Sequence, residues 1–231
     1  MRTIIYILII IWGCPLSAQI SHDTIFEKVR ENYSSAKPIQ FNTVYNLYKN
    51  YTTQSVNETY KGEYFKNQQG DTFIKINNTE YFLTKKISAQ INRDEKIILV
   101  MGSDNLKKDG FNILQTLNLF NKGSLKDKKT HWEVELLGKQ ISQLPYSRIV
   151  IHISKDYYIQ KQIYYYSNGI DFSKDFSKPD IQAPRLEIIC SKPNRNTISS
   201  KIFDFSKYFT INGTSLKLSE ASKDFSLIDQ R

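Results

Sequence analysis

The sequence predicts a mainly β fold: an unclosed, strongly curved antiparallel β-barrel, or half-barrel, covered by α-helices. Three observations lead to this. From residue 39 onward, apolar and polar residues alternate with a period of two over many short segments. Short polar or glycine-containing connections separate most of them, as in an antiparallel meander. Only two segments have a helical period, and no regular alternation of strand and helix suggests a doubly wound parallel sheet.

The amino-terminal segment has the features of a secretory signal. An apolar run from Ile4 to Trp12 follows the single positive residue Arg2. The run is shorter than the roughly 20 apolar residues that a helix needs to cross a bilayer. We therefore expect this segment to direct export rather than to anchor the chain, with an uncleaved anchor as the less favoured interpretation.

Two processing sites follow the apolar run. Leu16-Ser17-Ala18 fits a signal-peptidase site that cuts before Gln19, which predicts a signal peptide at 1–18 and one domain at 19–231. The residues before Cys14 match a bacterial lipobox less well, because bulky Trp12 precedes the cysteine and Pro15 follows it. A soluble periplasmic protein is thus expected, with a lipoprotein anchored at Cys14 as the alternative.

Composition indicates a globular, aromatic-rich chain. The 231 residues include 15 Tyr and 13 Phe but few Gly and Pro, and the formal charge is +9. The basic residues are spread along the sequence, which is typical of a solvated surface, although transient attraction to an anionic membrane is an alternative. After cleavage Cys190 is the remaining cysteine, in an alternating strand, so we expect a buried, unreactive thiol.

Two amphipathic helices are expected. In the first, from residue 22, Thr24 and Glu27 have capping-box spacing, and one face carries Ile25, Phe26, Val29 and Tyr33. The second lies in 109–123, is apolar over much of its circumference, and should end at Gly123. Strands are predicted at 39–48, 58–66, 71–77, 80–86, 88–92, 96–102, 131–138, 147–153, 157–167, 184–191, 201–206 and 214–220, with a loop at 171–184.

Residue patterns typical of catalysis are weak. The histidines, His22, His131 and His152, stand in unrelated sequence contexts, so no metal site is predicted. Glu133 and Glu135 share one strand face, which a polar solvent-facing row explains better than paired acid and base work. We therefore predict a non-enzymatic protein without a cofactor. Export also argues against nucleic acid as a partner, although Tyr, Phe and Lys are interleaved.

The order of elements resembles the LolA-type periplasmic lipoprotein carriers of bacterial envelopes. The resemblance covers roughly residues 20–220 and lies in four places: "TYKGEYFK" with Gly62, Tyr64 and Lys66; "INRDEKIILV"; the helix around Phe111; and "LEIICSKPNRNTISSKIFDFS". It implies a half-barrel whose concave, helix-covered face holds lipoprotein acyl chains, or another lipid, during transfer to the outer membrane. It also implies a monomer that meets membrane-protein donors and acceptors.

One departure from the family pattern concerns the latch of the lid. The family has Arg-Pro after the second strand, where this chain has Asn67-Gln68. Because the same fold also serves envelope-stress sensors, a protein-binding module or sensor of an envelope assembly is the alternative function.

A sheet with consecutive apolar residues, such as Ile149 to Ile151, needs a cover on its inner side, either helices or ligand. A dry core completed by the second helix is the simpler alternative. The candidate ligand-binding residues are Phe41, Tyr45, Leu47, Trp132 and Val134 in the wall, with Phe111, Leu114 and Leu117 in the lid.

We expect the exported chain to begin at Gln19. N-terminal sequencing and intact-mass measurement of protein recovered from the periplasm test this. A mature chain that begins with an acylated Cys14 would instead favour a membrane-tethered protein, since two or more acyl chains anchor stably.

Overall fold

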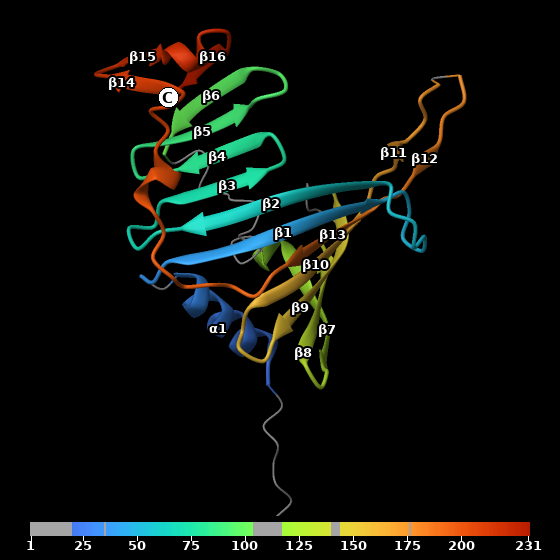
Figure 1. Cartoon of the computed structure of the whole chain (residues 1–231). Coiled ribbons are helices and arrows are strands. Elements are labelled where there is room, and N and C mark those ends of the chain that lie inside the picture. Colours follow the sequence, from blue (N-terminus) through green and yellow to red (C-terminus); the bar gives the residue numbers. More distant parts are fainter. Residues whose placement is uncertain (1–19, 35, 104–116, 140–143, 176) are drawn as a thin grey trace, which may run out of the picture.

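A computed structural model of the protein describes residues 20–34, 36–103, 117–139, 144–175 and 177–231. One curved sheet of 12 strands dominates it, in the order β16-β6-β5-β4-β3-β2-β1-β13-β10-β9-β8-β7 (Figure 1). Its strands are β1 Ile39–Tyr48, β2 Glu58–Lys66, β3 Thr72–Ile76, β4 Thr79–Leu83, β5 Ile87–Asn92, β6 Ile97–Gly102, β7 Phe120–Asp127, β8 His131–Gly138, β9 Tyr146–Ser154, β10 Ile159–Tyr166, β13 Arg185–Cys190 and β16 Ser226–Gln230.

The strand order confirms the unclosed, curved half-barrel. Among the described strands, β16 and β7 stand at the two ends of the order, so the sheet does not close on itself. The strands predicted within 39–102 and 131–191 are present, with ends that differ by no more than three residues. The sheet is not wholly antiparallel, however, because β16 pairs with β6 in parallel, Ser226 opposite Ile97.

The first helix is confirmed as α1, His22–Ser34, but its cap is one turn earlier than expected. The Ser21 hydroxyl accepts a hydrogen bond from the Thr24 amide at 3.1 Å, so Ser21 and not Thr24 satisfies the free amides of the first turn. Ile25, Phe26 and Val29 form its buried face. The sequence pattern thus located the apolar stripe correctly and misplaced the amino-terminal cap of the helix.

The second predicted helix is wrong in its carboxyl-terminal part. Phe111 and Leu114 lie outside the described residues, while Leu117 lies in the short 3-10 helix η1, Leu117–Leu119. Phe120 begins β7, and Gly123 lies within β7 near a register shift rather than after a helix. A Cβ at Gly123 would lie 2.9 Å from Glu135 Cγ, so the glycine allows close strand approach and does not cap a helix.

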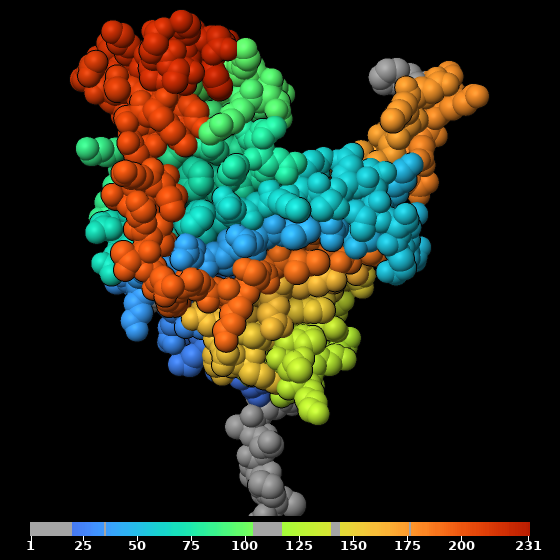
Figure 2. Space-filling view, viewed as in Figure 1, coloured from blue at the N-terminus to red at the C-terminus, as the bar shows by residue number. Residues whose placement is uncertain are grey.

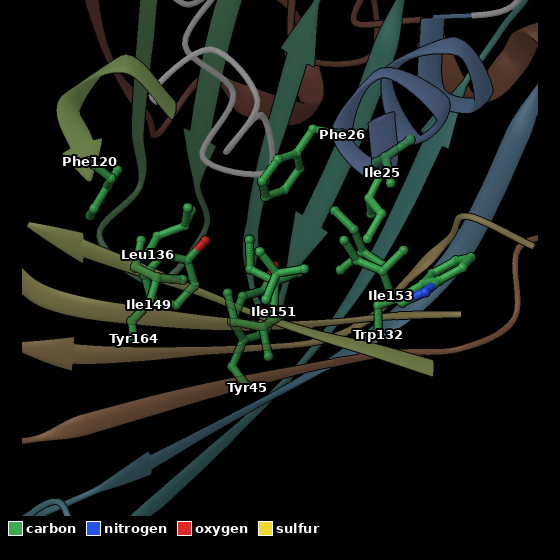
Figure 3. Packing of buried hydrophobic residues seen from close by; sticks show 14 residues of the cluster. Ile25, Phe26, Tyr45, Phe120, Trp132, Leu136, Ile149, Ile151, Ile153 and Tyr164 are labelled. Carbon is green, nitrogen blue, oxygen red and sulfur yellow. The ribbon is translucent and has the colours of Figure 1, made fainter. Parts of the chain in front are cut away.

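The two faces of the sheet are covered at opposite ends. We define the inner face as the one that carries Tyr45, Trp132 and Ile151, on which α1 packs (Figure 3). The inner face continues across β2, β3 and β4, where Tyr64, Ile74 and Tyr81 lie opposite one another and therefore point to the same side of the sheet. Neighbouring residues such as Phe73, Phe82 and Val100 therefore point to the outer face.

The carboxyl-terminal segment covers the outer face of β3 to β6, where Phe203, Tyr208 and Phe209 pack on Phe82 and its neighbours. Residues 201–206, predicted as a strand, contain the 3-10 helix η2, Ser200–Phe203. Residues 214–220 contain β15, Ser215–Leu218, which pairs with β14, Phe209–Asn212, in a separate hairpin. Phe203 and Phe205 alternate in the sequence because their side chains pack on the outer face of the sheet, not because they belong to one of its strands.

Outside the 12-stranded sheet are two further features. The loop predicted at 171–184 is framed by the short hairpin of β11, Ile170–Asp171, and β12, Ile181–Gln182, which projects from the body of the molecule (Figure 2). A third 3-10 helix, η3, Glu220–Ser222, precedes β16.

A buried carboxylate joins the carboxyl-terminal segment to the sheet. Glu80 on β4, whose side chain is 3% exposed, accepts hydrogen bonds from Arg93 (2.5 Å), Lys207 (3.2 Å) and the Tyr208 hydroxyl (2.9 Å). Burial alone would raise the pKa of Glu80, but the Tyr208 hydrogen bond and the charges of Lys207 and Arg93 outweigh it and lower the pKa. The ionised carboxylate is therefore the stable form in the fold.

Replacing Glu80 with Gln should reduce the free energy of unfolding at pH 7 by about 1–3 kcal/mol, since a charge-assisted network is lost and Arg93 and Lys207 are half exposed. Because the folded pKa is depressed, the wild-type contribution is full above the unfolded pKa of about 4.3 and is lost as the pH falls through the folded value. Urea unfolding at pH 7 and pH 3 measures this, with exposed Glu95→Gln as the control. Equal loss of stability on acidification in wild type and Glu80→Gln would contradict it.

Candidate functional site on the inner face of the sheet

The predicted wall residues share one face of the sheet. Phe41 and Tyr45 on β1, and Trp132 and Val134 on β8, are all buried on the inner face. Leu47 has the same orientation as Tyr45, lies opposite Leu186 on β13, and is half-buried. The period-two pattern therefore grouped these residues correctly, although β1 and β8 are separated by three strands in the sheet.

Gly62 on β2 shapes the centre of this wall. It lies opposite Thr43 on the inner face, between neighbours with large side chains. A Cβ at this position would lie 2.5 Å from Thr43 Oγ1 and 3.0 Å from Tyr45 Cε2. Glycine is thus required for close packing of the Tyr45 ring across β2.

Helix α1 covers the part of the inner face formed by β8, β9 and β10. Figure 3 shows Ile25 and Phe26 of α1 above Ile151, Ile153 and Trp132. Leu117 of η1 is half-buried and packs against the same cluster. Among the described residues, α1 is the α-helix that serves as the lid of the half-barrel.

The carboxyl-terminal end of α1 is tied down by cations. The Arg195 guanidinium donates to the Asn32 carbonyl at 2.6 Å and to the Tyr158 hydroxyl at 3.2 Å, and the Lys66 ammonium donates to the Tyr33 carbonyl. The last carbonyls of a helix generally lack a partner within the helix, and the negative end of the helix dipole favours positive charge there. Two residues distant in sequence thus hold the lid at one end.

Asn67, where the LolA-type sequence pattern has an arginine, forms part of a turn. Its side chain exchanges hydrogen bonds with Asp71 within the β2–β3 turn, at 3.0 and 2.9 Å. Lys66, the residue before it, contacts α1 instead. The contacts to the end of α1 thus come from Lys66, the last residue of β2, and from Arg195, and no spacing in the sequence identifies either of them.

Beyond α1 the inner face continues as a partly apolar surface over β3 to β6. Leu83, Leu99 and Met101 point to this face and are half-buried, as is Tyr81. The α1 residues Ile25, Phe26 and Val29 belong to the cluster over β7 to β10 and not to this part. The inner face is thus more extensive than the area on which the buried face of α1 packs.

On the inner face, the buried side-chain nitrogens of Gln162 and Trp132 have no hydrogen-bond partner in the part of the chain that the structure describes. The Gln162 side chain, 1% exposed on β10, accepts a hydrogen bond from the Tyr164 hydroxyl at 2.7 Å, but its Nε2 has none. Trp132 Nε1 is likewise buried and unpartnered. Most buried polar groups in folded proteins are satisfied, so both donors need an explanation.

Sequence reasoning did not find Gln162, because a register shift between Ile159 and Lys161 changes the phase of β10. Strict alternation from Ile159 would turn Ile163 inward and Gln162 outward. The shift instead brings Gln162 and Tyr164 inward, opposite Ile151 and Ile149 on β9. A bulge of this kind leaves little trace in a single sequence.

Cys190 faces the same side and is half-buried at the end of β13. Burial raises the pKa of its thiol to about 12. The thiol is therefore protonated at neutral pH, in agreement with the expected unreactive cysteine.

Strand pairing brings two of the histidines together. His131 on β8 and His152 on β9, placed in unrelated contexts by the sequence, stack with ring centroids 4.7 Å apart on the outer face. Glu133 lies directly opposite His152 in the register. Strand pairing creates this group, and a single sequence does not reveal which strands pair.

Comparison with known proteins shows similarity in fold. No family model and no curated protein matches the chain. An uncharacterized conserved protein from Thermus thermophilus is 10% identical, with TM-score 0.51, over 90% of this chain and 98% of that one. A LolA superfamily protein from Nitrosomonas europaea is 9% identical, with TM-score 0.38, over 81% and 99%.

A third solved structure is the Pseudomonas aeruginosa MucA/MucB complex, 9% identical with TM-score 0.37, which aligns with 84% of this chain and 62% of that one. Structures of the LolA kind are thus among those similar to this chain, as the sequence resemblance implied. At such identities the likeness concerns the fold. Separately, no helix within the described residues is long and apolar enough to cross a membrane.

Replacing Arg195 with Met should loosen α1 while leaving the rest of the sheet intact. Loss of the charged hydrogen bond to Asn32 costs about 1.5–3 kcal/mol, equivalent to roughly 10- to 150-fold faster amide exchange in α1 if that helix opens locally. Hydrogen-exchange mass spectrometry of peptides from 22–34 measures this against peptides from β3 to β6. Arg30→Met changes an exposed residue of α1 and serves as the control. Unchanged amide exchange of α1 in Arg195→Met would contradict the role of Arg195 in holding the end of this helix.

Proposed function

We propose that this chain is an exported, non-enzymatic carrier of the bacterial envelope that binds acyl chains of lipoproteins, or of another lipid, on its inner face beneath α1. The carrier is released in the periplasm after cleavage behind Ala18, acts as a monomer, and delivers its cargo toward the outer membrane. The wall is formed by Phe41, Tyr45, Leu47, Trp132 and Val134, with Leu117 near the lid and with Phe111 and Leu114 as further lid residues.

The observation that carries this proposal is the chemistry of the inner face. It is an apolar surface that extends past the α1 contact, and it contains buried donors at Gln162 and Trp132 with no partner among the described residues. Binding sites for small apolar molecules combine these features: apolar walls with few polar groups that fix orientation. An ester or amide carbonyl of an acylated ligand would accept a hydrogen bond from such a donor.

The energetics suit reversible binding. Each buried methylene contributes about 0.8 kcal/mol, so an acyl chain of about a dozen carbons binds in roughly the micromolar range after the cost of association is subtracted. The lid is attached to the rest of the protein by one apolar stripe and by polar contacts at both of its ends, including the Asp23–Lys122 ion pair at 2.6 Å. Its displacement is therefore of comparable cost, as loading and release require.

The charge of the chain fits a transient membrane encounter. Removal of Arg2 with the signal lowers the formal charge from +9 to +8. Such a surface is attracted to anionic headgroups at low salt and released as salt screens the interaction.

A protein-binding module of an envelope assembly is the second candidate. It is favoured by β7, which ends the described sheet and pairs on one side with β8. An extended segment of a partner protein can add to such an edge by backbone hydrogen bonding. This function predicts partner binding without extractable lipid.

Leu47→Glu should weaken binding of a fluorescent fatty acid by at least about tenfold, because it places a carboxylate on the inner face at a cost of more than about 1.4 kcal/mol. Val44→Glu is the matched control: Val44 lies on the same strand, is also half-buried, and points to the outer face. Probe titration is combined with circular dichroism to confirm that both variants fold.

Mass spectrometry of organic extracts from natively purified wild type gives an independent test, and we expect lipid at a substantial fraction of one molecule per chain. Folded wild type that yields no lipid and takes up no probe would overturn the carrier function and favour the protein-binding module. Equal weakening by the Leu47 and Val44 changes would contradict the assignment of the inner face.

A further inference from the structure

Strand pairing gathers three side chains with metal-binding atoms on the outer face. His131 and Glu133 lie two residues apart on β8 and so point the same way. His152 on β9 is opposite Glu133, and one ligand atom from each of the three residues can be chosen so that all lie within 4.8 Å of one another. Because the ladder between β8 and β9 is regular from His131 to Leu137, the backbone positions of this group are well defined.

The two imidazoles are close neighbours. The rings of His131 and His152 stack with centroids 4.7 Å apart and planes inclined by 19°, and side-chain rotation would bring a nitrogen of each to one ion. Nδ1 of His131 lies 3.0 Å from the Thr130 hydroxyl, and a hydrogen bond there leaves Nε2 for a ligand. Glu133 Oε2 lies 3.9 Å from His152 Nε2.

The surrounding charges are largely balanced by carboxylates. Lys126 on β7 binds the other oxygen of Glu133, Oε1, at 3.0 Å, which leaves Oε2 directed at His152. Lys161, opposite His152 on β10, pairs with Glu187 at 2.6 Å. A metal ion at the site would share the Glu133 carboxylate with Lys126, one oxygen for each, whereas Lys161 is paired with a carboxylate outside the site.

We propose that His131, Glu133 and His152 bind one divalent transition-metal ion of the zinc type. Two imidazoles and one carboxylate suit Zn²⁺, Co²⁺ and Ni²⁺ better than Ca²⁺ or Mg²⁺, which favour oxygen ligands. Metal bonds of about 2.0–2.2 Å require the ligand atoms to lie roughly 3–3.5 Å from one another. Rotation of the partly exposed side chains can shorten the present separations of up to 4.8 Å to this range. Three protein ligands leave a position for water or for a group from a partner.

The site is independent of the lipid-binding proposal, because it lies on the opposite face of β8 from Trp132 and Val134. Full-length mature protein prepared without a polyhistidine tag should bind one Zn²⁺ per chain in calorimetry. Co²⁺ should give visible d–d absorption of a nitrogen- and oxygen-ligated ion. Since loss of a residue that only hydrogen-bonds to a metal ligand costs about 10–100-fold in affinity, loss of a ligand itself should cost at least as much, so His131→Ala, His152→Ala and Glu133→Gln should each weaken binding at least tenfold.

His22→Ala is the matched control, since His22 lies on α1 away from the outer face, and it should bind Zn²⁺ like wild type. Circular dichroism establishes that each variant is folded, and the Glu133→Gln change preserves side-chain volume in case a histidine variant is unstable. Absence of stoichiometric Zn²⁺ binding by wild type would overturn the site. Binding that survives in the folded His131, His152 and Glu133 variants, or that is lost in His22→Ala, would also overturn it.

Discussion

The alternation of side chains across a continuously hydrogen-bonded sheet is the constraint on which the rest of the molecule depends. β1 pairs with β2 on one side and β13 on the other, so the direction of each β1 side chain determines that of its partners. A one-residue slip would exchange Tyr45 for Val44 on the inner face and move the Gly62 gap away from the Tyr45 ring. The wall beneath α1 and the polar row behind it are two results of the same register.

This constraint also explains why the two cores lie on opposite faces. A strongly curved sheet offers one face to a helix and leaves the opposite face exposed elsewhere along its length. Here α1 buries the inner face of β8 to β10, and the carboxyl-terminal segment buries the outer face of β3 to β6. Glu80 strengthens the second contact with a buried charge network, whereas α1, which lies over the candidate ligand surface, is held by one apolar stripe, by the Arg195 hydrogen bonds at its carboxyl end and by the exposed Asp23–Lys122 ion pair at its amino end.

Most of the fold could be predicted from local patterns, because strands such as β1, β2 and β8 alternate without interruption. The errors arose where non-local packing decides the conformation. Phe203 and Phe205 alternate but serve as plugs, Phe120 pairs with Gly138 instead of extending a helix, and a register shift turns Gln162 inward. The wall residues of the candidate site were accessible to sequence reasoning, whereas the Arg195 latch and the paired histidines required knowledge of which distant segments meet.

The Arg195 contact has a consequence for the order in which the protein assembles. The residue that holds the end of α1 lies 163 positions after Asn32, and the strands under α1 also follow it in the chain. A polypeptide that emerges amino end first therefore presents α1 long before its docking surface exists. The helix cannot close early over a half-formed barrel, and the inner face becomes covered only when nearly the whole chain has emerged. Closing long loops is slow, so docking of the lid is placed among the last steps of folding.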